Sequence, residues 1–116
     1  MNEENTKKLF KKYPKMLSNL KYIDTKDGWF WLINRLCERI QTYIDDNQHL
    51  KTPQITVEQI KQKCFGLRFY YINGDEKING MVWFAEYLSY FINEKTGEIK
   101  SVPTSTGFFS PSSGRK

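Results

Sequence analysis

One segment, residues 29–47, constrains the fold more than any other part of the sequence. Its apolar residues recur every three or four positions, the spacing that places side chains on one face of an α-helix. Further apolar residues widen this stripe, so other elements must cover much of the helix. The stripe consists of Trp29, Ile33, Leu36, Ile40 and Ile44, widened by Leu32, Cys37 and Tyr43. We therefore expect a central core helix.

The start of this helix also has a signature. Asp27 is a plausible N-cap, because a carboxylate there accepts hydrogen bonds from the first backbone N–H groups of a helix. Gly28 follows it and would allow another segment to approach the backbone closely. A loop, residues 45–54, is expected after the helix ends.

The run LRFYYI, residues 67–72, indicates a β-strand, because aromatic and β-branched residues follow one another without a breaker. Alternation along a strand predicts that Leu67, Phe69 and Tyr71 face the core. Arg68 and Tyr70 would then lie on the opposite face, available to a partner.

The residues just before that strand favour a short helix. Thr56-Val57-Glu58-Gln59 matches a capping box, a hydroxyl followed three residues later by a glutamine. We expect this helix to direct Val57, Ile60 and Cys64 inward and to end at Gly66.

Two further helices are expected, over residues 2–20 and about 75–92. Pro14 interrupts the first and predicts a kink or two short helices. The second follows a turn at Asn73-Gly74-Asp75 and is apolar on several sides, so it lies deep in the fold or offers part of its surface to a partner. Its aromatic residues are Trp83, Phe84, Tyr87, Tyr90 and Phe91.

Together these elements predict an α+β fold: a mainly helical single domain with three or four helices and a small antiparallel sheet that contains LRFYYI. The domain spans residues 1–97 and includes a basic N-terminal helical segment. Residues 98–116 would hold a short strand at 98–102 and a Ser-, Thr-, Gly- and Pro-rich tail that we expect to be mobile. Phe108 and Phe109 would be exposed there unless they dock.

Composition narrows the class of protein. At 116 residues the chain is long enough to fold without disulfides, and 39% hydrophobic residues support a core. Cys37 and Cys64 lack the spacing of metal ligands, so we expect two buried thiols in a reducing compartment. The absence of a long apolar run or an N-terminal apolar signal region predicts a soluble protein of the bacterial cytoplasm.

The net charge of +5 is concentrated at the N-terminus. Residues 1–26 hold seven lysines against three acidic residues, which leaves a net charge of +4 there. A polyanion or an acidic protein surface would be attracted to this segment first. Alternatively, these lysines only form a solvated helix face and bind no partner. The lysines of the expected first helix are Lys7, Lys8, Lys11, Lys12 and Lys15.

No constellation of catalytic residues is evident. His49, the single histidine, lies in a polar loop without an obvious orienting partner. The acidic pairs Asp45-Asp46 and Asp75-Glu76 are more typical of solvated helix ends than of a metal site. Glycine-rich phosphate loops are absent from the sequence. We expect neither an enzyme nor a cofactor or metal.

The segment Lys63–Tyr70 can be laid over the octamer of RNA-recognition domains. Cys64, Leu67 and Arg68 do not fit that octamer, and the surrounding βαββαβ pattern is missing, so this fold is not expected. Arg68 and Tyr70 could still meet a base or an acidic protein surface. Local pairing of Arg68 with an acid is the alternative.

Three stretches, GWFWLINRLCERI, VEQIKQKCFGLRFYY and AEYLSYFINEKTGE, resemble a family of small uncharacterised phage and prophage proteins. They cover about two-thirds of the chain. Members of the family often continue into Cys-Glu-x-Cys-Gly, half of a zinc ribbon, where this chain has Asn93 and Thr96, so the metal site would be lost here. The small, basic chain also looks like an anti-CRISPR or similar anti-defence protein in type.

The resemblance implies a mobile-element origin. From the position of the charge and the excess of aromatic residues, we expect a non-enzymatic inhibitor of a host defence nucleoprotein complex, such as an RNA-guided CRISPR effector, that acts through protein or guide-RNA contacts. A direct nucleic-acid-binding protein and a structural accessory of the mobile element are the alternatives. The side chains expected to contact the partner are Lys7, Lys8, Lys11, Lys12, Lys15, Arg68, Tyr70, Trp83, Tyr87 and Tyr90.

Overall fold

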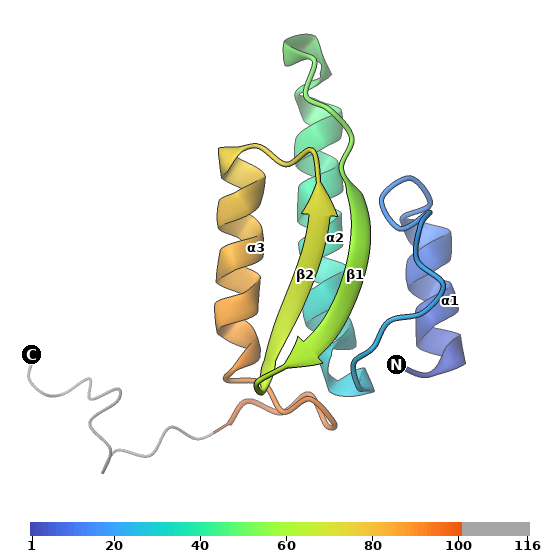
Figure 1. The fold of residues 1–116 in the computed structure, drawn as a ribbon, viewed down its shortest axis with the longest axis vertical. Helices are drawn as coiled ribbons and strands as arrows, with labels where there is room; N and C mark the ends of the chain where they lie inside the picture. Colours follow the sequence, from blue (N-terminus) through green and yellow to red (C-terminus); the bar gives the residue numbers. More distant parts are fainter. Residues whose placement is uncertain (101–116) are drawn as a thin grey trace, which may run out of the picture.

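The computed structural model describes residues 1–100 and shows the predicted α+β fold, with three α-helices and one two-stranded antiparallel sheet in this part of the chain (Figure 1). A search of the described residues finds no helix that is long and apolar enough to cross a membrane. The elements in chain order are α1 (Glu3–Lys12), η1 (Asp27–Trp29), α2 (Phe30–Asp46), η2 (Gln48–Leu50), β1 (Thr56–Lys63), β2 (Gly66–Ile72) and α3 (Glu76–Ser89).

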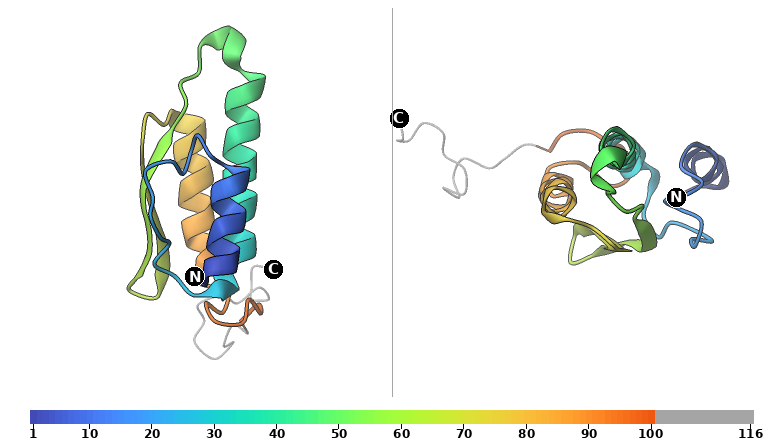
Figure 2. Two further views of the ribbon diagram at one scale, coloured as in Figure 1. Left: turned by 90° about the vertical axis from the view of Figure 1, so that its right-hand side faces the viewer. Right: turned by 90° about the horizontal axis from the view of Figure 1, so that it is seen from above.

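The helices and the hairpin form two layers. The β1–β2 hairpin lies on one side, and α2 and α3 lie side by side behind it (Figures 1 and 2). Helix α1 stands on the far side of α2 from α3. The predicted stripe of α2 is almost entirely buried, which confirms its central position.

The predicted short helix at residues 56–65 is wrong, because residues 56–63 form strand β1. The register of β1 against β2 shifts between Val57 and Gln59, so Glu58 is an extra residue in the strand. This bulge places the inward-facing Val57 and Ile60 three positions apart, where a regular strand would place them two apart. A spacing of three is also helical, and the strand therefore looked like a helix.

The two strands meet in a two-residue turn, Cys64-Phe65. Both residues have positive φ, 53° and 69°. A type I′ hairpin turn requires positive φ at both central positions, and residues other than glycine rarely adopt it. Phe65 is 80% exposed, and Cys64 is exposed as well. The prediction of two buried thiols therefore holds for Cys37 and fails for Cys64.

Both edges of the hairpin are covered. On the β2 side, the N–H groups of Leu67 and Phe69 donate to Ser89 Oγ and Glu86 Oε2 of α3, both at 2.9 Å. On the β1 side, Asp24 pairs with the strand through its own N–H and carbonyl. These contacts protect strand edges that would otherwise pair with another chain.

Helix α1 ends at Lys12, two residues before Pro14, as a proline interruption requires. Residues 14–19 form turns, so the second half of the predicted helix is not helical. The apolar residues of that half are nevertheless buried, since Met16 and Leu17 join the core.

The entry to α2 is packed against the C-terminal end of the described chain. Gly28 N donates to Glu94 O at 2.6 Å, and a Cβ on Gly28 would lie 2.2 Å from Asn93 O, so the predicted close approach is confirmed. Asp27 is not the N-cap of α2, as Trp29 holds that position. The Asp27 carboxylate instead accepts hydrogen bonds from Asn2 N and Asn5 Nδ2 at the start of α1. The hydrogen bond from Asn2 N is the largest cause of the lowered pKa of Asp27.

Beyond α3, Ile92 and Ile99 form an isolated antiparallel bridge. The strand expected at 98–102 lies only partly within the described residues, which end at 100. The expectations for the tail, including Phe108 and Phe109, concern positions outside the described residues.

Candidate interaction surface

Helix α3 is apolar on two opposite faces. Its inner face is buried against α2 and the hairpin and consists of Ile78, Val82, Ala85 and Ser89. The outer face is made of positions displaced by about half a turn, at 100° per residue. We call this outer face, formed by Trp83, Phe84 and Tyr87 together with Phe91 just beyond the end of the helix, the aromatic face of α3.

The rings of the aromatic face form one cluster around Tyr87. Tyr87 lies at the centre, stacked at centroid distances of 6.2 Å from Trp83 and 6.3 Å from Phe84, and edge-on at 5.2 Å from Phe91. Trp83 is 69% exposed, Phe84 53% and Tyr87 42%. Ring pairs at such distances stabilise each other, so the cluster is preorganised in the free protein.

Gly80 extends this face by one turn towards the start of α3. A Cβ at Gly80 would meet no atom within 4 Å, so neither packing nor backbone φ requires a glycine there. Glycine inside a helix costs roughly 0.5–1 kcal/mol relative to alanine. The position thus weakens the helix and leaves it without a side chain one turn before Phe84.

The start of α3 is fixed by Asp75, which is the N-cap. Its Oδ1 accepts from Ile78 N at 2.9 Å, and its Oδ2 accepts from Tyr43 Oη of α2 at 2.5 Å. The Tyr43 hydroxyl lowers the pKa of Asp75 most, and the Ile78 N–H lowers it further. The acidic pair Asp75-Glu76 therefore belongs to a helix terminus, as the sequence indicated.

Arg68 and Tyr90 form a second, smaller group beside this helix. Arg68 Nη2 donates to Tyr90 Oη at 3.1 Å, and its guanidinium lies 6.0 Å from the ring centre. The Tyr90 hydroxyl holds the pKa of Arg68 above its usual range. A Cβ on Gly66 would lie 2.5 Å from this ring, so only glycine leaves room for Tyr90 at the start of β2.

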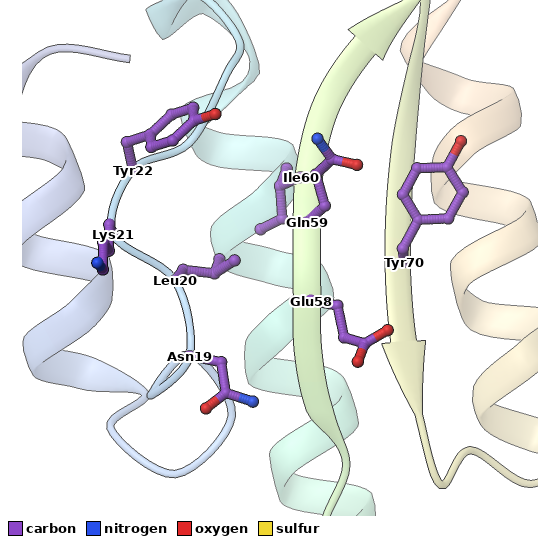
Figure 3. A pocket seen from close by; sticks show the side chains of 8 residues that line it. All are labelled: Asn19, Leu20, Lys21, Tyr22, Glu58, Gln59, Ile60 and Tyr70. Carbon is purple, nitrogen blue, oxygen red and sulfur yellow. The ribbon is translucent and has the colours of Figure 1, made fainter.

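Tyr70 has different neighbours from Arg68, although both are on the predicted outer face of β2. It borders an open groove of about 580 Å³ between the hairpin and residues 19–22 (Figure 3). In Figure 3, Tyr22 and Tyr70 stand on opposite sides of β1, with the side chains of Glu58 and Gln59 between them. The predicted Arg68–Tyr70 pair is therefore divided, and Arg68 is directed to Tyr90.

The five predicted lysines lie far from α3. They are all exposed, and they lie on or just after α1, on the opposite flank of the molecule (Figure 1). Lys7 and Lys8 are 3.5 and 3.8 Å from Glu3 and Glu4 of the same helix, and Lys12 Nζ donates to Asn34 Oδ1 at 3.4 Å. The structure thus splits the predicted site into two surfaces, one basic and one aromatic.

Sequence reasoning left Phe84 out of the candidate residues, although it is more exposed than Tyr87 or Tyr90. A helical projection would have found it. Gly80, Phe84, Tyr87 and Phe91 are separated by four, three and four residues, a stripe that lies opposite the buried one.

Groups suited to catalysis or metal binding do not come together in the described part of the chain. Residues 1–100 contain no cluster of three or more His, Cys, Asp or Glu side chains that could hold a metal ion. Cys37 is fully buried, which raises the pKa of its thiol to about 12 and disfavours the nucleophilic thiolate.

Comparisons of the chain with protein-family models, with curated proteins and with solved structures find no match.

Proposed function

We propose that this protein is a non-catalytic binding protein whose aromatic face of α3 docks on another protein. One observation carries the proposal: three exposed rings that stack on one another, Trp83, Phe84 and Tyr87, cover the side of α3 that the protein's own core does not use. Tyr and Trp dominate the energetics of protein interfaces, because they bury a large area with few rotatable bonds.

The size of the exposed aromatic patch is consistent with a site that binds a partner. A fully buried aromatic side chain covers roughly 150–250 Å², so the exposed fractions of Trp83, Phe84 and Tyr87 leave on the order of 350 Å² of ring surface. The largest apolar patch on a typical monomer is about this size and is often functional. Three adjacent exposed rings on one helix also differ from the single exposed apolar residues that need no explanation.

The charged residues of α3 favour a protein over a nucleic acid as the binding partner. Proteins that bind single strands combine stacking rings with a basic groove for the phosphates. Helix α3 carries one basic and two acidic residues, Lys77, Glu76 and Glu86. Helix α3 itself therefore offers a single cation, Lys77, to phosphates.

The resemblance to phage and prophage proteins extends the proposal to the identity of the partner, a protein of a host defence nucleoprotein complex. An RNA-guided effector is the example we favour. Inhibition would follow from occupation of a protein surface, without chemistry on either partner. Retention of nucleic acid alone would instead favour direct polyanion binding.

The test is capture of a partner by tagged protein from nuclease-treated lysate of a bacterium that carries such a defence system. Trp83→Ala is compared with Trp31→Ala, a matched control because Trp31 of α2 is similarly exposed, 64% against 69%. We expect one protein or complex to be retained by the unmodified chain and by Trp31→Ala, and lost with Trp83→Ala.

Phage plating on the same strain provides the functional readout. Expression of the unmodified chain and of Trp31→Ala should restore plaques, and Trp83→Ala should not. Equal capture by both tryptophan variants would contradict a role for the aromatic face. Capture without restored plaques would contradict the defence-complex assignment while leaving the protein contact intact.

A further inference from the structure

A second surface, on the opposite flank, has a different character. A groove of about 540 Å³ runs between α1 and α2, and we call it the α1–α2 groove. Its lining combines apolar walls with basic side chains and contains no acidic residue. The lining residues are Lys8, Leu9, Lys11, Lys12, Phe30 and Asn34.

One wall of the groove is held in place by hydrogen bonds. Asn34 Oδ1 accepts from Tyr13 Oη at 2.7 Å and from Lys12 Nζ at 3.4 Å. Burial, together with the nearby Cys37 and Glu38, raises the pKa of Tyr13 to about 12, so its hydroxyl remains a donor. Because Oδ1 is used, the amide nitrogen of Asn34 is the atom that it can offer to a ligand.

The polar groups that the groove offers are therefore all donors. Lys12 is further positioned over the Tyr13 ring, at 5.5 Å from its centre. The exposed Glu4 is 3.8 Å from Lys8 Nζ, but a pair so exposed is weak and can give way to a ligand. Acceptors with negative charge complement this set of groups.

We propose that the α1–α2 groove binds an acidic peptide segment that carries an apolar side chain. The carboxylates would pair with the lysines, and the apolar side chain would lie against Phe30. Helix α1 has ten residues and is about 15 Å long, which matches four or five residues of extended peptide. This inference uses a surface that the proposed function leaves unassigned and does not depend on it.

A single-stranded nucleic acid fits the groove less well. Such ligands stack successive bases on successive rings. The lining of this groove includes one aromatic ring, Phe30, which is only partly exposed. An apolar side chain flanked by carboxylates can pack on Phe30 and pair with the lysines, whereas a row of bases would need several rings to stack on.

The test measures fluorescence anisotropy of a labelled peptide EELFEE with the full chain. We expect saturable binding that is at least about tenfold tighter than that of EESSEE, because burial of even one apolar side chain supplies that much. Lys11→Gln should weaken binding up to about fivefold, the upper range for an exposed charge pair. Lys8→Gln/Lys11→Gln should weaken it further.

Lys63→Gln is the matched control, since Lys63 is an exposed lysine on the hairpin, away from the groove. It should leave peptide binding unchanged. Equal binding of EESSEE, equal effects of the variants at positions 11 and 63, or no saturable binding would each overturn the proposal. Displacement of the peptide by a ten-residue oligouridylate that binds more tightly would overturn it in favour of nucleic acid.

Discussion

The two flanks of this molecule carry surfaces of opposite character. The α1 flank is basic: its lysines are exposed, and two of them pair with glutamates of their own helix. The α3 flank is aromatic: its rings stack on one another, and its few charged residues leave it nearly neutral.

This difference separates two contributions to binding. Exposed lysines act at long range and are screened by salt, so they mainly affect the rate of association. Desolvated rings act only at contact, so they mainly affect how long a complex lasts. A chain with both on separate flanks can attract a partner with one surface and hold it with the other, or hold two partners at once.

The largest expected effect is that of Trp83→Ala on binding of the captured partner. We expect a loss of about 2 kcal/mol or more, as for a central interface anchor, and little dependence on salt. The unfolding free energy should change by less than about 0.5 kcal/mol, since the side chain is mostly exposed. Titration calorimetry at low and high salt measures the first, and urea denaturation the second. A loss of stability equal to the loss of binding would break the distinction between the two flanks.

The next effect concerns Asp75, which holds the start of α3. Asp75→Ala should lower the unfolding free energy by about 1 kcal/mol, the usual cost of removing an N-cap. Folding lowers the pKa of Asp75, so its contribution is complete above the unfolded pKa, about 3.9, and is lost as the pH falls through the folded value.

Urea denaturation at pH 7 and at about pH 3 checks this prediction. Asp75→Asn is the control, because asparagine keeps a capping oxygen but carries no charge. Its stability should depend less on pH than that of the unmodified chain over this range. A pH dependence unchanged by Asp75→Asn would argue against the assigned role of the carboxylate.

Gly80→Ala should raise the unfolding free energy by roughly 0.5–1 kcal/mol, because alanine is the better helix former and its Cβ meets no atom. The same change should weaken binding of a partner that packs against the helix backbone at Gly80. Opposite signs in denaturation and calorimetry would sharpen the assignment of the aromatic face. A gain in both would show that the partner does not reach this turn of α3.

The smallest effect is expected on α1. Lys7→Gln should change the unfolding free energy by a few tenths of a kcal/mol at most, because Lys7 and Glu3 are exposed and 3.5 Å apart. Thermal denaturation at low and high salt measures this contribution, which salt should erase. A change above about 1 kcal/mol, or one that persists in high salt, would contradict a weak and screened contribution from this ion pair.

Much of the fold could be predicted from residues that are close in sequence. The α2 stripe and the LRFYYI strand each have a periodicity that specifies one element. Strand β1 could not be predicted in this way, because its bulge gives it a helical spacing and its hydrogen-bond partners lie on β2. The candidate site was predicted only in part, since the sequence identified the lysines and the aromatic residues but placed them in one group.

The sequence by itself determined which segments are amphipathic, where the charge lies and that α3 has more apolar residues than a core needs. These are local properties, set by side-chain type and spacing. Only the tertiary structure decided that Arg68 contacts Tyr90 instead of Tyr70, that Cys64 is exposed in a turn, and that the basic and aromatic surfaces lie on opposite flanks. Those outcomes depend on which segments pack on the hairpin and on one another, and that arrangement is set by contacts between residues that are distant in the chain.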